Sequence, residues 1–512
     1  MHRTRAAFAT AAICLSLTGT TARADVTASQ VWADWRGYLQ GFGYRVSGTQ
    51  SAQGPTLTVD DIVLETGAPD AATTIQFGPL VFTEIDQGRV EVVVPDAMPV
   101  TLDIAADALQ PATQVTLTYA QTGTQMIVSG AAGDLRYDYS ADAVALDLAG
   151  LMIDGAPVAD DLVQFSLNAE ALQSMTGVRV GTVRSYDQNI RIGALRYDLF
   201  YASPNGIDAL QFDTDTQSLV VTGTSVLPLD GTRGADDLTA LLKAGVQVKT
   251  SATAQQTETK IALTSAEGTT RIKTGVAQTA LTLDVSARGA SYGVQAQQVQ
   301  MGARVAGLPF PLFAQMEGSR FKITAPVLKR EIPQDFDLAL SLTDFTMSDI
   351  IWAAFDPSAQ LPRDPVNVTV DLNGKATVLL DDLDTAAMNR MATRGTSPLQ
   401  LDALQINRLD IDALGATLRA RGAVTLDNAK TITLPGFPAF PKPVGEVTMN
   451  LTGVSALVDR LGATGLLPPL NVAAAKIMLG VFAVPGAAPD TFTSTLTATQ
   501  DGQILANGRR VK

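Results

Sequence analysis

The chain has 512 residues, with 37 lysines and arginines against 51 aspartates and glutamates, a formal net charge of −14 at neutral pH. An acidic surface repels phosphate backbones, and no cluster of basic residues offsets it, so the composition argues against nucleic-acid binding. The chain contains one histidine, His2, and one cysteine, Cys14.

The first 24 residues have the pattern of a secretory signal peptide. Arg3 and Arg5 precede an apolar run over residues 6–17, and a small-x-small cleavage site ends at Ala24. An uncleaved anchor is the alternative, but the run is shorter than the roughly 20 apolar residues that a membrane helix needs. Lipid attachment at Cys14 is disfavoured, because a lipobox needs a small residue where Ile13 stands. We therefore expect cleavage after Ala24, export to the periplasm and no later membrane-spanning segment.

Cleavage would remove both His2 and Cys14, together with three of the 37 basic residues, leaving 34 basic against 51 acidic residues and a net charge of −17. The processed chain would then lack disulfides, Ser-His-Asp and Cys-His catalysis, and metal or haem sites built on imidazole or thiolate. We expect no cofactor and no metal. The acidic charge also argues against docking on anionic lipid head groups by charge alone.

Thr27 and Gln30 have the spacing of a helix capping box, and the apolar residues that follow predict a first helix over residues 26–43. Val31, Trp35 and Leu39 fall on one face of this helix. A helix that lies on a sheet is favoured over a membrane or partner helix, since Arg36 is its only basic residue. Further helices are expected over the ranges 235–244, 347–355, 454–463 and 470–482. The last of these contains a single charged residue, Lys476, so we expect it to be largely buried.

Between these helices the chain is a succession of short segments of alternating polarity, rich in Thr, Val and Ile, such as 246–248 and 261–263. This pattern is typical of antiparallel sheet. We expect an α+β fold, mainly antiparallel β, in the form of an extended or curved sheet with a few helices packed on one face. A loop and helix over 227–245 predict two β-rich halves, 25–234 and 235–512.

The segment 345–380 is especially rich in residues that end or interrupt secondary structure. It contains a short helix with Trp352, three prolines, and Asn373-Gly374, which predicts a hairpin turn. Arg363 and Asp364 lie between two of the prolines, so a fixed arginine could hold a carboxylate there. A structural salt bridge is the favoured alternative for that arginine.

Two phenylalanines among four prolines form a second candidate binding region. Phe437 and Phe440 would mark a contact surface for lipid or a partner protein if exposed, and would plug the end of a sheet if packed. The sequence leaves both possibilities open.

These motifs permit a comparison with a known family. Trp352, Asp356-Pro357, the LPRDP element at 361–365 and Gly374 resemble the domain-of-unknown-function 2125 family of alphaproteobacterial exported proteins. The resemblance extends over nearly the whole processed chain. That family has no established activity, so it implies no catalytic residue. More loosely, the C-terminal part resembles AsmA-type envelope proteins, which are linked to lipid handling.

Paired aspartates are the remaining acid–base material, and the closest groups are Asp213/Asp215, Asp381/Asp382/Asp384 and Asp410/Asp412. Glycoside hydrolysis needs two carboxyl groups that flank a cleft, one of them with a raised pKa. Aspartates two apart on a strand share one face and are usually solvated. No calcium-loop spacing is present.

The favoured hypothesis is a non-enzymatic periplasmic protein that binds a hydrophobic ligand such as lipid, or an envelope protein partner. The alternative is a carbohydrate-active hydrolase that uses paired aspartates. The deciding feature would be whether one side of the sheet is open and apolar or is filled by residues 470–482.

Overall fold

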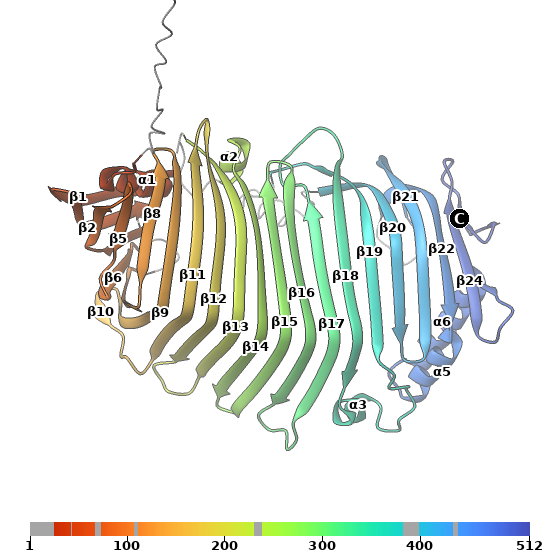
Figure 1. Ribbon diagram of the computed structural model, residues 1–512. Helices are drawn as coiled ribbons and strands as arrows, with labels where there is room; N and C mark the ends of the chain where they lie inside the picture. The colour runs from red at the N-terminus through yellow and green to blue at the C-terminus, as the bar shows by residue number, and fades with distance from the viewer. Residues whose placement is uncertain are drawn as a thin grey trace, which may run out of the picture.

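The computed structural model describes residues 25–41, 43–66, 73–106, 111–229, 238–381, 399–433 and 439–511. Across these ranges, 26 strands join into one sheet whose ladders are antiparallel. Figure 1 shows the long strands side by side, from α1 at one end of the molecule to α5 and α6 at the other. The expected class, α+β and mainly antiparallel β, is confirmed.

The strands fall into three groups along the chain. The N-terminal group is β1 (Arg45–Gln53), β2 (Thr56–Thr66), β3 (Thr73–Phe77), β4 (Leu80–Ile85), β5 (Arg89–Val93), β6 (Ala97–Ile104), β7 (Thr113–Thr122) and β8 (Gln125–Ala131). The central group is β9 (Asp134–Ile153), β10 (Ala156–Pro157), β11 (Val163–Val180), β12 (Val183–Ala202), β13 (Ala209–Pro228), β14 (Gln247–Ser265), β15 (Gly268–Ser286), β16 (Gly289–Arg304), β17 (Leu312–Ala325) and β18 (Gln334–Met347). The C-terminal group is β19 (Val366–Val378), β20 (Leu399–Ala413), β21 (Ala416–Ile432), β22 (Phe440–Thr452), β23 (Val484–Pro485), β24 (Thr491–Ala498), β25 (Ile504–Ala506) and β26 (Arg509–Arg510).

The described helices lie close to the expected ranges. They are α1 (Ala28–Gly41), α2 (Leu238–Lys243), α3 (Asp349–Phe355), α5 (Val454–Ala463) and α6 (Pro469–Phe482). The prediction that the last helix is largely buried is wrong, because none of the residues of α6 is buried. Its lack of charge therefore reflects an exposed apolar surface.

The expected boundary between two halves falls between β13 and β14. These strands pair directly from Ala209↔Thr264 to Val226↔Gln247, so the hydrogen bonding of the sheet continues through this point. α2 lies between these two strands in the sequence, and the strands remain direct neighbours in the sheet.

Five residues in the middle of long strands have a left-handed backbone, which residues other than glycine rarely adopt. They are Ala171 in β11, Ser218 in β13, Gln256 in β14, Gln298 in β16 and Asp344 in β18. The cross-strand register places them at one level, since Gln255, Gln278, Gln297 and Gly318 are successive neighbours immediately beside that level. We call this line across the sheet the crease, and Figure 1 shows that the long strands bend along their length.

The alternation of side chains changes phase at the crease. In β16, Tyr292 and Val294 occupy even positions before Gln298, whereas Val299 and Met301 occupy odd positions after it. An irregular residue of this kind bends a strand and re-aims the side chains that follow it. The apolar residues on the two sides of the crease therefore share one face of the sheet.

The crease also explains why the long strands look short in the sequence. The segments 246–248 and 261–263 read as separate strands, yet both belong to β14, with the phase change at Gln256 between them. A strict two-residue period breaks at that point, so the pattern divides one strand of 19 residues into two pieces.

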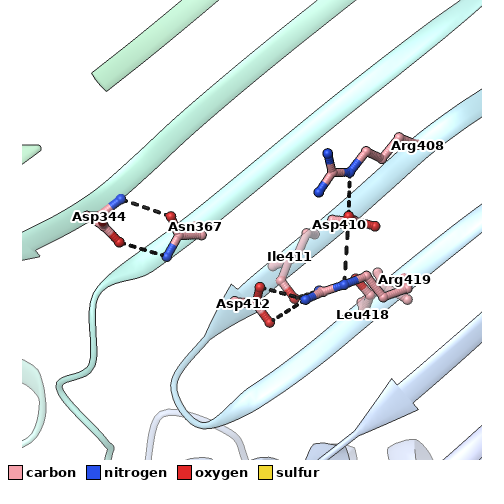
Figure 2. Close-up of polar contacts among 8 residues, drawn as sticks. All are labelled: Asp344, Asn367, Arg408, Asp410, Ile411, Asp412, Leu418 and Arg419. Carbon is pink, nitrogen blue, oxygen red and sulfur yellow. Dashed lines mark hydrogen bonds and ion pairs between the residues drawn. The ribbon is translucent and has the colours of Figure 1, made fainter. Parts of the chain in front are cut away.

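At its C-terminal end the crease is held by a side-chain bridge. The backbone N–H of Asp344 donates to Asn367 Oδ1 at 3.0 Å, and Asn367 Nδ2 donates to Asp344 Oδ1 at 3.1 Å (Figure 2). The asparagine of β19 thus satisfies a backbone donor that the irregular residue removes from the ladder.

The main core lies where α1 covers one end of the sheet. Thr27 and Gln30 form the expected capping box at the start of α1, in which each side chain hydrogen-bonds the other residue's backbone N–H. Trp35 packs edge-on against Phe82 of β4, with 5.6 Å between ring centroids. Beside this helix, the N-terminal strands form a closed circuit, because β2 reaches β9 both through β3, β6 and β7 and through β4, β5 and β8.

A buried polar network fastens α1 to the sheet. Asp34 of α1 pairs with Arg184 of β12 at 2.5 Å and accepts a hydrogen bond from the Tyr137 hydroxyl of β9 at 2.7 Å. Burial, reinforced by the neighbouring Asp34 carboxylate, raises the pKa of Tyr137, so this phenol stays protonated and donates. The network connects the one long covering helix to two strands that are distant in sequence.

The predicted hairpin at Asn373-Gly374 is wrong. β19 runs through both residues, which pair with Asp337 and Phe336 of β18. A side chain at position 374 would lie 2.1 Å from the Ala403 carbonyl oxygen and 2.7 Å from the Phe336 ring, so glycine is required here by close packing and not by a turn.

We predict that Ala171→Gly stabilises the protein. Relief of a left-handed alanine is worth about 1–2 kcal/mol, against an entropic cost of about 0.5–1 kcal/mol for glycine. The matched control is Ala169→Gly, two residues away in ordinary strand conformation, which should destabilise. Urea unfolding midpoints should therefore move in opposite directions, and a loss of stability in both variants would contradict the crease.

We predict that Arg184→Ala lowers the free energy of unfolding by about 3–5 kcal/mol, because it leaves the Asp34 carboxylate buried without its partner. The double variant Asp34→Ala/Arg184→Ala should lose less than the sum of the two single changes. The control is Arg136→Ala, which breaks the exposed pair with Asp138 and should cost about 1 kcal/mol or less. Thermal melts of the four variants measure this.

Candidate functional site

The cross-strand register gathers apolar side chains into two adjacent rows on one face of the sheet, from β15 to β22. The first row is Leu281, Val294, Phe321, Leu340, Val370, Leu409, Ala420 and Met449. The second is Leu283, Tyr292, Ile323, Leu338, Leu372, Ile406, Gly422 and Val447. Paired residues of antiparallel strands project to the same side, so these apolar rows form a continuous surface.

The opposite face of the same strands is polar. One row there is Asp284, Ser291, Thr324, Asp337, Asn373 and Gln405. The two faces alternate residue by residue, so the difference between them is a property of the register and not of local composition.

The apolar rows are partly open to solvent. Tyr292 is 39%, Ile323 38% and Leu340 38% exposed. The main core covers the same face only toward one end of the strands, where α1 and Leu242 of α2 pack. In the described part of the chain, α6 packs against α5 and β24 and does not fill this face. The rows cross eight strands, a span of about 34 Å at the usual spacing of about 4.8 Å.

The corner that follows α3 brings two of the predicted site residues together. The Arg363 guanidinium lies 6.0 Å from the centre of the Trp352 ring and forms an ion pair with Asp349 at the start of α3. Trp352 is buried and packs against Phe355 at 5.1 Å between ring centroids. This is the geometry of the salt-bridge alternative, in which the arginine fixes the helix to the corner.

Asp356 holds the corner from inside. It is fully buried, and its carboxylate accepts hydrogen bonds from the backbone N–H groups of Gln360, at 2.9 Å, and Leu361, at 2.8 Å. The carboxylate thereby satisfies two donors of a turn that the prolines prevent from becoming helical. The Asp356-Pro357 motif in the sequence gave no indication of this role.

The remaining predicted site residues are divided. Asp364 lines a small hollow of about 230 Å³ together with Trp352 and Arg363. Phe440 is half-buried and pairs with Ile432, the last residue of β21. Phe437 lies outside the described residues. The structure therefore assembles Trp352, Arg363 and Asp364 but places Phe440 elsewhere.

A hollow of about 1020 Å³ contains Asp213 and Glu258 in its lining. Hydrogen bonds from Lys273 and Lys260 hold the pKa of Glu258 below its usual range. Burial and the contact with Asp213 raise the pKa of Asp198, but these two aspartates are direct cross-strand neighbours in contact with each other. Of these two aspartates, Asp213 belongs to the lining of the hollow and Asp198 does not.

The other aspartate pairs are engaged by cations. Figure 2 shows Asp410 bonded to Arg408 and Asp412 bonded to Arg419, with 2.7 Å from Arg419 Nη2 to Asp412 Oδ2. Asp215 pairs with Arg196, which lowers the pKa of that carboxyl. Asp381 accepts from Lys243 and from the Lys329 backbone, while Asp382 and Asp384 lie outside the described residues. These contacts give the hydrolase alternative no geometric support.

The apolar rows were not identified as a site from the sequence, although a signal was present. The segments 336–342, 366–372 and 404–411 each alternate apolar and polar residues. Their pairing partners were not known, so no segment by itself indicated a surface that crosses eight strands.

The chain matches no family model, no curated protein and no solved structure. The resemblances stated above therefore stay predictions. Within the described ranges, no helix is both long and apolar enough to cross a membrane. Nor does any group of three or more potential metal ligands occur among those residues.

We predict that Asp356→Ala destabilises the protein by about 2–3 kcal/mol, since it leaves two buried backbone donors without an acceptor. Arg363→Ala should cost about 1 kcal/mol or less, because Asp349 is highly exposed. Asp364→Ala is the matched control for removal of a carboxylate in the same corner. Chemical unfolding should rank the three variants, and a larger loss for Arg363→Ala than for Asp356→Ala would contradict the structural role of this corner.

Proposed function

We propose that the protein binds the acyl chains of a lipid along the apolar rows, as a non-enzymatic protein of the periplasm. The observation that supports this is the continuity of the rows from Leu281 to Met449 together with the partial exposure of Tyr292, Ile323 and Leu340. Partly exposed contiguous apolar surface marks a ligand groove or an interaction site.

The dimensions and chemistry of the rows suit an extended hydrocarbon chain. Their span of about 34 Å exceeds the roughly 15 Å that the acyl chains of one leaflet contribute to the hydrocarbon core of a bilayer, so a single extended chain can lie within the rows. Burial of each methylene group contributes about 0.8 kcal/mol, so a long chain laid across several strands would be held without any charged contact. The aliphatic and aromatic side chains of the rows offer no donor set for a polar substrate, apart from the Tyr292 hydroxyl.

The predicted export of the protein supports a lipid ligand. The N-terminal pattern predicts export, and the cell envelope is the compartment where lipids must cross an aqueous space. The companion hypothesis is that the rows receive an apolar segment of an envelope protein, which the experiment below separates from lipid.

The test is mass spectrometry of lipids extracted from the purified protein, compared with a native mass of the intact complex. Leu340→Glu places a charge within the apolar rows and should reduce retained lipid at least tenfold, because a carboxylate is costly to bury. Ser341→Glu is the matched control, since it introduces the same side chain at the next position, on the polar face of β18.

Retention should be normal in the Ser341→Glu variant, and circular dichroism should confirm that both variants keep their sheet. Wild-type protein that carries no lipid would contradict the proposal. A co-purifying polypeptide that Leu340→Glu releases would instead favour the partner-protein hypothesis.

A further inference from the structure

The outer side of α6 is an exposed apolar stripe that no described element covers. Leu470 is 79%, Ile477 65%, Met478 52% and Val481 50% exposed. Together with Ala474, these residues follow the i, i+4, i+7, i+8, i+11 spacing that places side chains on one face of a helix. We call them the α6 stripe. Most soluble surfaces do not expose several large aliphatic side chains in one place.

A second apolar stripe of α6 is already used in packing. Val472 lies so close to α5 that a side chain at Gly462 would be 2.9 Å from its Cγ2 atom. At the end of the helix, the Phe482 carbonyl accepts hydrogen bonds from Ser494 Oγ, at 2.6 Å, and Asn507 Nδ2, at 2.9 Å. These contacts use the side of α6 that faces α5 and β24, so they do not account for the apolar residues exposed in the α6 stripe.

The α5–α6 hairpin is positioned rigidly at one end of the sheet. Asp490 accepts hydrogen bonds from the backbone N–H groups of Ser455 and Ala456, each at 3.0 Å, and so fixes the start of α5. Figure 1 places α5 and α6 together beside β22 and β24, at the end of the molecule opposite α1. The stripe is thus presented by a rigid support.

The apolar rows end next to the strand that contacts the C-terminal end of α6. Met449, the last residue of the first row, pairs with Ser494 of β24, the residue whose hydroxyl donates to the Phe482 carbonyl of α6. The C-terminal end of α6 therefore lies beside the last strand of the apolar rows, and the α6 stripe lies on the outer side of the same helix.

We propose that the α6 stripe inserts shallowly into the surface of a lipid bilayer and that this contact delivers lipid to the apolar rows. The second clause rests on the proposed function, whereas the first stands on α6 alone. The occupant is a bilayer because the stripe is aliphatic and lacks the Trp, Tyr and Arg that dominate binding at protein interfaces. The position of α6 at the end of the apolar rows points to the same source.

The charge of the hairpin determines the kind of bilayer. The one charged residue of α6 is Lys476, and its ammonium is paired with Asp459 of α5 at 2.5 Å. The chain as a whole is acidic, with a net charge of −14. Attachment therefore depends on apolar insertion and not on attraction to anionic head groups, in contrast with basic amphipathic helices.

The experiment is flotation of the purified protein with vesicles of zwitterionic phosphatidylcholine. Ile477→Glu/Met478→Glu should weaken binding at least tenfold. The matched control is Ala473→Glu/Gly480→Glu, which adds the same charge at exposed positions off the stripe, where a side chain at residue 480 meets no atom within 4 Å. The control should bind as wild type does, and inclusion of anionic phosphatidylglycerol should not strengthen binding.

Absence of wild-type flotation, or equal loss in both double variants, would overturn the proposal. A dimer in light scattering that only Ile477→Glu/Met478→Glu dissociates, without flotation, would assign the stripe to a second copy of this chain and would also overturn it. Leu340→Glu separates the two proposals, because it should abolish lipid retention while leaving flotation intact. Normal lipid retention by a variant that no longer floats would reject delivery through α6 but preserve the apolar rows.

Discussion

The apolar rows depend on the cross-strand pairing of one antiparallel sheet. Because directly opposed residues project to the same side, a fixed register carries the apolar character of Leu340 into Phe321 on one side and Val370 on the other. A slip of one residue in a ladder would move the apolar side chains of that strand to the opposite face of the sheet. The backbone hydrogen bonds that fix the register therefore also fix which side chains form the apolar rows.

The crease allows long strands to keep their apolar side chains on one face of the sheet. A 20-residue strand such as β13 with a single unbroken period could present one apolar face only if its sequence kept strict alternation throughout. The left-handed residues reset the phase at one level in neighbouring strands, and the sheet bends there. The irregular residues cost backbone energy in the five strands that contain them, and the ladder hydrogen bonds on both sides hold them in place.

The two ends of the sheet have opposite characters. At the N-terminal end, α1 and the closed circuit of short strands bury the apolar face beneath tryptophan and phenylalanine, and the Asp34–Arg184 pair fastens the helix. At the C-terminal end, α6 uses one stripe to pack and leaves another exposed. This asymmetry, with a sealed end and an apolar open end, agrees with a surface that receives its ligand from one side.

The sequence by itself determined the class of fold, the positions of most helices and the capping box of α1, because these follow from local periodicity and local hydrogen bonds. It also indicated that Arg363 is more suited to a structural pair than to a ligand site. Only the tertiary structure decided that Gly374 lies within a strand against Phe336, that α6 is exposed, and that segments far apart in the chain align into apolar rows. The reason is that register, burial and the crease depend on which strands become neighbours, and that information is not contained in any single stretch of residues.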